Sequence, residues 1–251
     1  MKKVKFLFFL LSLCMILLSC TDKKPVSQVQ ESSVQQEDSV FVKKVDSVKV
    51  VKKKPLTYKI LVPFNYRLCN PDTIINQNWV ELYKDGKDYY VGKARYGIEM
   101  REDMCSSTIP TYLAEKRNTI LFVNQLPIKK GKVKIADIAF SDSTYLEPGS
   151  VRNFTFAGKH YKLEAKAQGE SQLKNYTLLL NGERIVREAR VDAASFALLF
   201  AGDLDGDGKL DLVLSLPLHY ENLRVVLFLS SCAPPGLQIG KAAEIVDDFS
   251  C

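Results

Sequence analysis

The spacing of turn signals is the feature that most constrains the fold of this chain. From residue 55 onward, short runs of β-branched and aromatic residues alternate with Gly-, Asn- or Pro-containing turns about every ten residues, a pattern typical of successive strands. We expect strands in the ranges 56–62, 79–83, 89–91, 119–123, 132–140, 154–156, 160–166, 176–180, 183–186, 196–200, 212–216 and 224–229. No segment has a sustained 3.6-residue apolar repeat, so the sequence predicts a mainly β body.

The expected architecture is an antiparallel sandwich or a barrel-like body over residues 55–251. The clearest hairpins turn at Asp85-Gly86, Gly158-Lys159 and Asn181-Gly182, and Asn-Gly suits a two-residue turn in which both φ angles are positive. No repeat of fixed period runs through the chain. A full propeller is therefore not expected.

The N-terminal sequence is typical of an export signal. Lys2, Lys3 and Lys5 precede an apolar run over residues 6–18. At about 13 residues, this run is shorter than the roughly 20 that a spanning helix needs, and it fits the apolar part of a signal peptide. We expect residues 1–19 to be a signal segment.

The sequence Leu17-Leu18-Ser19-Cys20 resembles the bacterial lipobox, in which the cysteine is lipidated and becomes the new N-terminus. The resemblance implies that Cys20 carries acyl chains such as palmitate, and several chains together give stable membrane attachment. We expect a cell-envelope lipoprotein on the outer membrane, with its domain facing the periplasm. An ordinary signal peptide or an uncleaved membrane anchor is the alternative.

The positive charge of the chain is confined to its first 54 residues. The formal net charge is +6, of which residues 1–19 contribute +3 and residues 20–54 another +3, so that residues 55–251 are neutral. A nucleic-acid-binding domain has its basic patch on the folded body, so we do not expect nucleic acid as a partner. Residues 20–54 lack the apolar content to form a core, and we expect a flexible tail there.

An Asp- and Gly-rich stretch at 203–211 is the sharpest chemical signal in the sequence. It contains four carboxylates: Asp203, Asp205, Asp207 and Asp211. Carboxylates this close repel one another and raise each other's pKa unless a cation neutralises them. Gly206 and Gly208 allow the positive φ angles of a tightly curled loop. A solvated turn without a metal is the alternative.

Calcium is the cation that we expect in this loop. Ca²⁺ takes six to eight oxygen ligands on a flexible loop, whereas Mg²⁺ requires stricter octahedral geometry and keeps its waters. Side-chain oxygens would come from the four aspartates, and Lys209 would contribute its main-chain oxygen.

The loop differs from an EF-hand in two respects. Its twelfth position is Leu214 instead of a bidentate Glu, and its flanks at 195–200 and 212–216 are strand-like. Residues 200–213 instead resemble the Asp-rich calcium loop of FG-GAP/VCBS-type repeats, which joins two strands of a propeller blade. The resemblance implies a structural calcium ion. The chain has one copy of the loop, whereas a propeller needs several blades. The resemblance therefore predicts the calcium loop in this chain but not a propeller fold.

Four cysteines remain outside the signal and the lipidation site. They are Cys69, Cys105, Cys232 and Cys251. An even number of cysteines in an exported domain favours disulfides. Three connectivities are possible, and we expect Cys69–Cys105 and Cys232–Cys251 because neighbours in sequence pair most readily. A zinc site is the alternative, but it lacks a close Cys-x-x-Cys pair.

The sequence has no recognisable catalytic motif. Gly-x-Ser-x-Gly, a Walker loop, a dinucleotide fingerprint and His-Glu-x-x-His are all absent. The histidines are His160, which we expect on a strand facing water, and His219, which we interpret as a loop residue although its sequence position also allows a place near the metal.

We therefore expect a non-enzymatic, calcium-stabilised β lipoprotein that binds a protein or glycan or has a structural role in the envelope. The alternative is a hydrolase of envelope or dietary polysaccharides with accessory calcium. Four tyrosines are candidates for stacking on a glycan, although core or edge packing is the simpler expectation: Tyr89, Tyr90, Tyr96 and Tyr112.

Overall fold

A computed structural model describes residues 58–101, 110–138, 144–170, 172–192 and 195–249. All of them belong to the larger of two compact units, Lys54–Cys251. The expected signal segment, the lipidation site Cys20 and the expected tail lie outside the described residues. Within the described ranges, no helix is long and apolar enough to cross a membrane.

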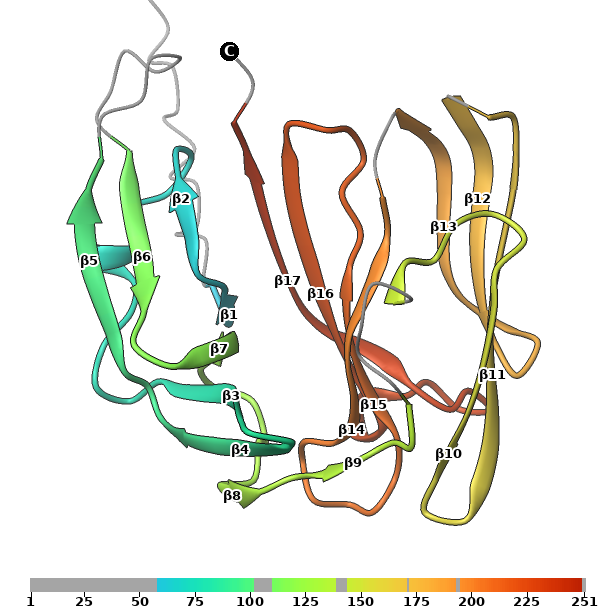
Figure 1. The fold of residues 1–251 in the computed structure, drawn as a ribbon, viewed down its shortest axis with the longest axis horizontal. Helices are drawn as coiled ribbons and strands as arrows, with labels where there is room; N and C mark the ends of the chain where they lie inside the picture. Colours follow the sequence, from blue (N-terminus) through green and yellow to red (C-terminus); the bar gives the residue numbers. More distant parts are fainter. Residues whose placement is uncertain (1–57, 102–109, 139–143, 171, 193–194, 250–251) are drawn as a thin grey trace, which may run out of the picture. The chain divides into compact units, whose positions relative to one another are not determined.

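The described chain forms four antiparallel sheets (Figure 1). The first contains β1 (Ile60–Leu61), β7 (Asn118–Val123), β3 (Val80–Asp85), β4 (Asp88–Lys93) and β8 (Gly131–Lys132). The second contains β2 (Phe64–Tyr66), β6 (Thr111–Glu115) and β5 (Tyr96–Met100). The third contains β10 (Val151–Phe156), β11 (Lys159–Gln168), β12 (Gln172–Leu180) and β13 (Glu183–Asp192). The fourth, called here the central sheet, contains β17 (Gly240–Asp248), β16 (Asn222–Leu229), β15 (Asp211–Ser215), β14 (Ala197–Asp203) and β9 (Lys134–Ile135).

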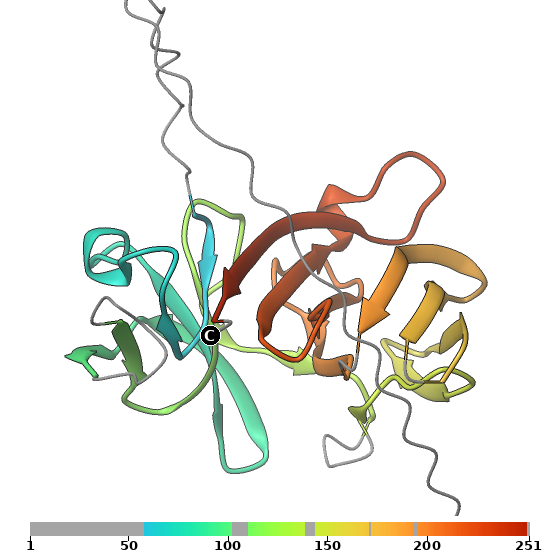
Figure 2. The same cartoon turned by 90° about the horizontal axis from the view of Figure 1, so that it is seen from above.

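The mainly β prediction is confirmed, and the described sheets do not close into a barrel or a propeller. The three predicted hairpins are present as β3–β4, β10–β11 and β12–β13 (Figure 2 gives the view from above). Two of their turns are shifted by one residue from the prediction, to Gly86-Lys87 and to Ala157-Gly158, because Asp85 pairs with Asp88 and Phe156 pairs with Lys159. At the third turn, Asn181 and Gly182 have φ angles of 51° and 86°. This is the turn with two positive φ angles that Asn-Gly predicts.

The central sheet is buried on both faces. Along β15, Leu212 and Leu214 pack into the core shared with β10–β13. Val213, between them, packs into the core shared with β1, β3, β4 and β7. Successive side chains of a strand point to opposite faces, so a strand with a core on each side is apolar throughout. This explains why 212–216 and 224–229 are nearly continuous apolar runs.

Residues 131–137, called here the strap, connect three of the sheets by backbone pairing. Lys132 pairs with Tyr90 of β4, and Lys134 pairs with Asp203 of β14. Asp137 forms an isolated bridge to Thr155 of β10. The predicted single strand over 132–140 is therefore wrong for its described part, because the chain changes pairing partner every two to three residues.

Strands β2, β5, β6 and β17 were not anticipated from the sequence. Residues 240–248 contain Ala, Lys, Glu and Asp, which are depleted in strands. The segment nevertheless pairs with β16 along its length, and it buries Ile245 in the core. Tertiary pairing therefore overrides a weak local preference here. Two short 3-10 helices complete the described fold, η1 (Pro71–Thr73) and η3 (Ser230–Cys232).

Candidate metal centre

The Asp-rich loop joins β14 to β15 at one end of the central sheet. These strands are antiparallel neighbours, and Gly202 pairs with Asp211, so the two ends of the loop lie side by side. Gly206 and Gly208 both have φ angles of +82°. The positive φ angles expected from the sequence are confirmed, and they curl the loop back over its own start.

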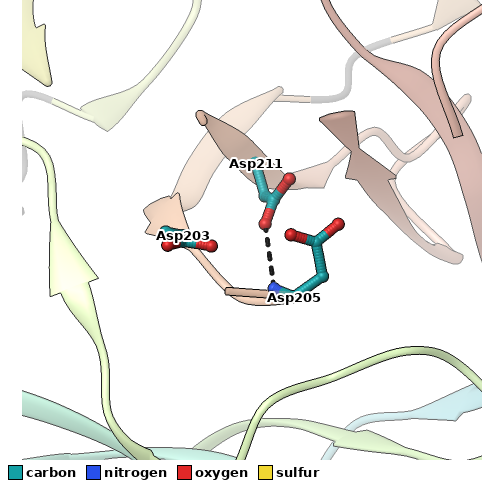
Figure 3. Close-up of side chains that lie close together, drawn as sticks. All are labelled: Asp203, Asp205 and Asp211. Carbon is teal, nitrogen blue, oxygen red and sulfur yellow. Dashed lines mark hydrogen bonds between the residues drawn. The ribbon is translucent and has the colours of Figure 1, made fainter. Parts of the chain in front are cut away.

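Three of the four predicted acidic ligands come together. Asp203, Asp205 and Asp211 each offer a carboxylate oxygen, and these oxygens lie within 4.8 Å of one another. Figure 3 shows the three side chains directed toward a common space. Oxygens at this spacing can share one cation as ligands.

Asp211 is the fixed element of the site. Its side chain has no exposed surface. One carboxylate oxygen, Oδ2, accepts the backbone N–H groups of Leu204 at 2.6 Å and Asp205 at 3.3 Å. The other, Oδ1, accepts the N–H of Ser230 at 2.8 Å. Burial, with a smaller contribution from the charge of Asp205, raises the pKa of Asp211 to about 7 although these hydrogen bonds oppose the shift.

Asp203 and Asp205 shape the loop through further backbone contacts. Asp203 accepts the N–H of Gly206 at 2.6 Å and that of Gly208 at 3.0 Å. Asp205 Oδ1 accepts the N–H of Asp207 at 3.2 Å. The other oxygen, Asp205 Oδ2, is buried and has no hydrogen-bond partner. A buried carboxylate oxygen without a partner is unfavourable unless a cation or a water occupies the adjacent space.

Asp207 does not join the cluster, in contrast to the sequence prediction. Its Oδ2 accepts the hydroxyl of Ser230 at 2.8 Å, and its Oδ1 accepts the backbone N–H of Lys209 at 2.8 Å. Burial alone would raise the pKa of Asp207, but these hydrogen bonds and the charge of Lys209 together lower it. Lys209 therefore contacts Asp207 twice, through this N–H and through its ammonium group, whose nitrogen lies 3.5 Å from Asp207 Oδ2.

Two contributors to the site come from distant parts of the sequence. Ser230 follows β16 and binds both Asp207 and Asp211. The backbone N–H of Lys129 donates to the carbonyl of Leu204 at 2.8 Å, and the Lys129 stem packs over Gly206. Neither residue belongs to the Asp-Gly pattern, so sequence spacing had no signal for them.

Lysines line the solvent side of the loop. Lys129, Lys132 and Lys134 border a pocket of about 240 Å³ together with Asp203 and Asp207. Positive charge near the carboxylates would offset part of their mutual repulsion, but the Lys132 ammonium is already paired with Asp88 Oδ2 at 2.7 Å.

Each of the two predicted disulfides has only one of its cysteines among the described residues. Cys69 is half-buried and Cys232 is exposed. Their expected partners Cys105 and Cys251 lie outside the described residues. Burial, followed by the nearby charge of Asp247, raises the pKa of the Cys69 thiol to about 11. A thiol with this pKa is a weak nucleophile at neutral pH.

The two histidines lie apart from the carboxylate cluster. His219 Nε2 is 3.3 Å from Asp248 Oδ2, where β17 ends beside the start of β16. This is the end of the central sheet opposite to Asp211. His219 therefore does not lie near the candidate metal site, a place that its sequence position had allowed. His160 is exposed and lines a pocket of about 440 Å³ with Asp137, Thr155 and Lys162.

The four candidate tyrosines have packing partners within the protein. Tyr89 is buried and meets the Phe200 ring edge-on, with centroids 5.5 Å apart. The other three contacts are Tyr90 on Tyr83 at 5.7 Å, Tyr96 on Phe122 at 6.2 Å and Tyr112 under the Arg101 guanidinium at 3.4 Å. These contacts agree with core or edge packing.

No protein-family model, curated protein or solved structure matches this chain. The function therefore rests on the geometry of the site and on the sequence.

Proposed function

We propose that this chain is an exported lipoprotein whose β body binds Ca²⁺ at the 203–211 loop and acts through binding or as an envelope component. The observation that carries the calcium site is the convergence of oxygens from Asp203, Asp205 and Asp211 within 4.8 Å. The partnerless Asp205 Oδ2 supports it, since a cation there would satisfy a buried oxygen.

Calcium suits this ligand set better than magnesium. Three carboxylates supply part of the six to eight oxygens that Ca²⁺ takes, and the main-chain carbonyl of Lys209 and waters would supply the others. Asp207 already has partners in Ser230 and Lys209, so it would be at most a secondary ligand. The resemblance of the loop to FG-GAP/VCBS-type loops favours the same ion.

The role of the ion would be structural. The loop connects β14 to β15, Asp211 is bonded to Ser230 beyond β16, and Asp203 pairs with Lys134 of the strap. A cation held here would fasten the central sheet at the point where the strap crosses it. Because the ion binds the native state and not the unfolded chain, it would raise the free energy of unfolding.

The cellular role follows from the N-terminal sequence. The lipobox-like sequence at Cys20 would place the β body at the envelope, on the outer membrane and facing the periplasm, on a tail of about 34 residues that reaches roughly 30–35 Å. A tethered, calcium-stabilised body fits a protein that binds another protein or a glycan.

One observation favours the hydrolase alternative. The pocket of about 440 Å³ beside β10 and β11 is lined by both His160 and Asp137. In the described part of the chain, however, no hydrogen bond links His160 to Asp137 or Thr155, so an activated nucleophile is not assembled. Loss of a glycan-hydrolysing activity in His160→Ala would support this alternative.

Calcium-dependent melting tests the metal site. At calcium concentrations 100 times Kd, the ion should add about 2.7 kcal/mol to the free energy of unfolding. For a body of this size, that raises Tm by about 5–10 °C relative to protein in chelator. Asp205→Asn should weaken calcium binding roughly tenfold or more because it removes one ligand charge.

Asp72→Asn is the matched control, because Asp72 is an exposed carboxylate in η1. It should leave calcium binding unchanged. A wild-type Tm that does not respond to calcium would refute the metal site.

Membrane fractionation tests the lipid anchor separately. Cys20→Ser should release the protein from membranes or block its processing. A Cys20→Ser variant of normal mature size that still fractionates with membranes would refute the lipoprotein assignment and leave the metal site unaffected.

A further inference from the structure

The sheet β10–β13 ends in an open edge. Its outer strand, β13, pairs with β12 on one side only. Among the described residues, Asp192 alone has main-chain contacts on the other side of β13: it bridges to His219, and its N–H donates to the carbonyl of Leu218 at 2.8 Å. The N–H and C=O groups along an unpaired edge can pair with a further strand. From Arg184 to Arg190, this edge is open over about 20 Å.

The sheet β10–β13 is one strand shorter than the five-stranded central sheet that it packs against. The two sheets meet at one side, where Asp137, just after β9, bridges to Thr155 of β10. Near the other side, Glu188 Oε1 of β13 lies 2.6 Å from Arg224 Nη1 of β16. In the described part of the chain, β17 beyond β16 therefore has no strand opposite it.

The uncovered face of β17 has an exposed apolar side chain. Val246 of β17 pairs with Arg224, and paired residues of neighbouring strands point to the same face. Val246 thus lies on the face from which Arg224 reaches β13, and it is 45% exposed. A fifth strand added beside β13 would cover this side chain.

Two arginines without ion-pair partners lie along the open edge. Arg184 and Arg187 pair with Leu179 and Thr177 of β12, and both arginines are exposed. A register shift between Leu178 and Leu179 puts them on the same outer face, although they are three positions apart. Within the described residues, neither guanidinium has a hydrogen bond or an ion pair. The outer face of this edge is therefore positively charged.

We propose that β13 binds an extended acidic segment of another protein, which adds to the sheet β10–β13 as a fifth strand. Main-chain pairing supplies affinity in such complexes, and the alternating side chains supply specificity. One set of side chains in the segment would lie beside Arg184 and Arg187, and the other would lie over Val246. Carboxylates suit the first set, and apolar groups suit the second. The inference rests on the proposal above that the β body binds another protein, but it does not require calcium.

A second copy of β13 is the alternative occupant of the edge, and its charge is less suitable. The outer face of β13 has three exposed arginines, of which only Arg190 has a carboxylate partner, Asp192 at 2.9 Å. Two such strands side by side would bring uncompensated positive charges together, and like charges destabilise cross-strand pairs. The edge therefore favours an acidic segment over a second copy of itself.

Fluorescence anisotropy with synthetic peptides tests the proposal on the full chain. The probe is a fluorescein-labelled peptide of four Glu-Val repeats with blocked ends, and four Lys-Val repeats are the matched control. We expect saturable binding of the Glu-Val peptide and about tenfold weaker binding of the Lys-Val peptide, because cross-strand attraction becomes repulsion. Binding should be the same in calcium and in chelator. No saturable binding of the Glu-Val peptide up to about 1 mM would overturn the proposal.

N-methylation of the peptide separates strand pairing from attraction between charges. Two further probes carry N-methyl groups on every Glu or on every Val of the Glu-Val peptide. A strand paired along one edge uses the N–H of every second residue, so one probe should bind like the parent peptide and the other about tenfold more weakly. Equal affinities of the two probes would mean that no strand is added, and would overturn the proposal.

Substitutions in the protein locate the binding edge. Arg187→Glu should weaken binding of the Glu-Val peptide about tenfold. Lys159→Glu makes the same change of charge at an exposed position of β11, which is paired on both sides, and should leave binding unchanged. Melting checks that both variants fold. Equal effects of the two substitutions would place the peptide elsewhere and contradict the proposal.

Sedimentation of the full chain, with and without the Glu-Val peptide, tests the alternative occupant. We expect a monomer in both cases. A dimer that the peptide does not dissociate, and that Arg187→Glu alters, would assign the edge to a second copy and overturn the proposal. Failure of the peptide experiments leaves the calcium-dependent melting and the membrane fractionation unaffected, so the two proposals fail separately.

Discussion

Asp211 Oδ1 accepts the backbone N–H of Ser230 at 2.8 Å, so the last acid of the Asp-rich loop is bonded to the segment that ends β16. Its other oxygen accepts the N–H groups of Leu204 and Asp205 at the start of the same loop. One buried carboxylate therefore joins the ends of β14, β15 and β16 before any cation is bound. This separates the contribution of Asp211 to folding from its contribution to metal binding.

Asp211→Ala should destabilise the protein even in chelator. Three N–H groups lose their acceptor, and each unsatisfied buried group costs about 1–3 kcal/mol, so we expect a loss of about 3–5 kcal/mol. Asp205→Ala should lose less, about 1 kcal/mol in chelator, because its Oδ1 accepts only the exposed Asp207 N–H and its Oδ2 has no partner. Urea unfolding of both variants with chelator measures the difference, and equal losses would contradict this division of roles.

Metal-free protein should become less stable as pH rises from about 4 to about 7. In this interval the unfolded chain has released the Asp211 proton, whereas the folded protein, with a pKa of about 7, still binds it. The native state then binds more protons, so the free energy of unfolding falls with rising pH. Urea unfolding in chelator at pH 5 and pH 8 measures this slope.

Asp211→Asn is the control for the pH dependence, because it removes the titrating group. The decline between pH 5 and pH 8 should be shallower in this variant than in the wild-type protein. An identical slope in the two proteins would assign the pH dependence to other carboxylates.

Hairpins were predictable from the sequence because their signals are local. Asn181-Gly182 and Ala157-Gly158 adopt positive φ angles that the turn chemistry requires, and the flanking apolar residues fix the register. The strap was not predictable. Whether residues 131–137 pair with one strand or with three depends on where distant sheets lie, and an alternating pattern is the same in both cases.

At the candidate metal site, too, the sequence predicted the local contacts but not those that depend on distant strands. Spacing alone identified Asp203, Asp205 and Asp211, since a curled loop brings such positions together. It also predicted Asp207, whose two oxygens are instead occupied by Ser230 and Lys209. That choice depends on Ser230, a residue 23 positions away, and only the pairing of β15 with β16 places it there.

Gly202→Ala should weaken the attachment of the strap. A Cβ at this position would collide with the carbonyl oxygen of Lys134 and would lie 2.7 Å from the Phe200 ring and 3.1 Å from the Ile135 Cα. Relief requires β9 to move away from β14, so we expect a loss of about 1–3 kcal/mol. Urea unfolding measures the loss.

Gly92→Ala is the matched control for that substitution. Its added Cβ would meet only the Tyr83 and Arg117 side chains, at 3.4 Å or more. It should cost less than Gly202→Ala, and the reverse order would argue against close packing between the strap and β14.

Glu81→Gln should be strongly destabilising, because Glu81 is a fully buried carboxylate that neutralises the charge of the Arg117 guanidinium. It accepts the Arg117 guanidinium and the backbone N–H of Arg95, and the same guanidinium lies 3.7 Å from the Tyr83 ring centroid. Removing its charge leaves Arg117 with an uncompensated charge that is only partly solvated, so we expect a loss of about 2–4 kcal/mol in the free energy of unfolding. Glu99→Gln removes the same charge from an exposed pair with Arg101 and should cost less than about 1 kcal/mol. Similar losses in the two variants would mean that burial of Glu81 adds nothing to its pairing with Arg117.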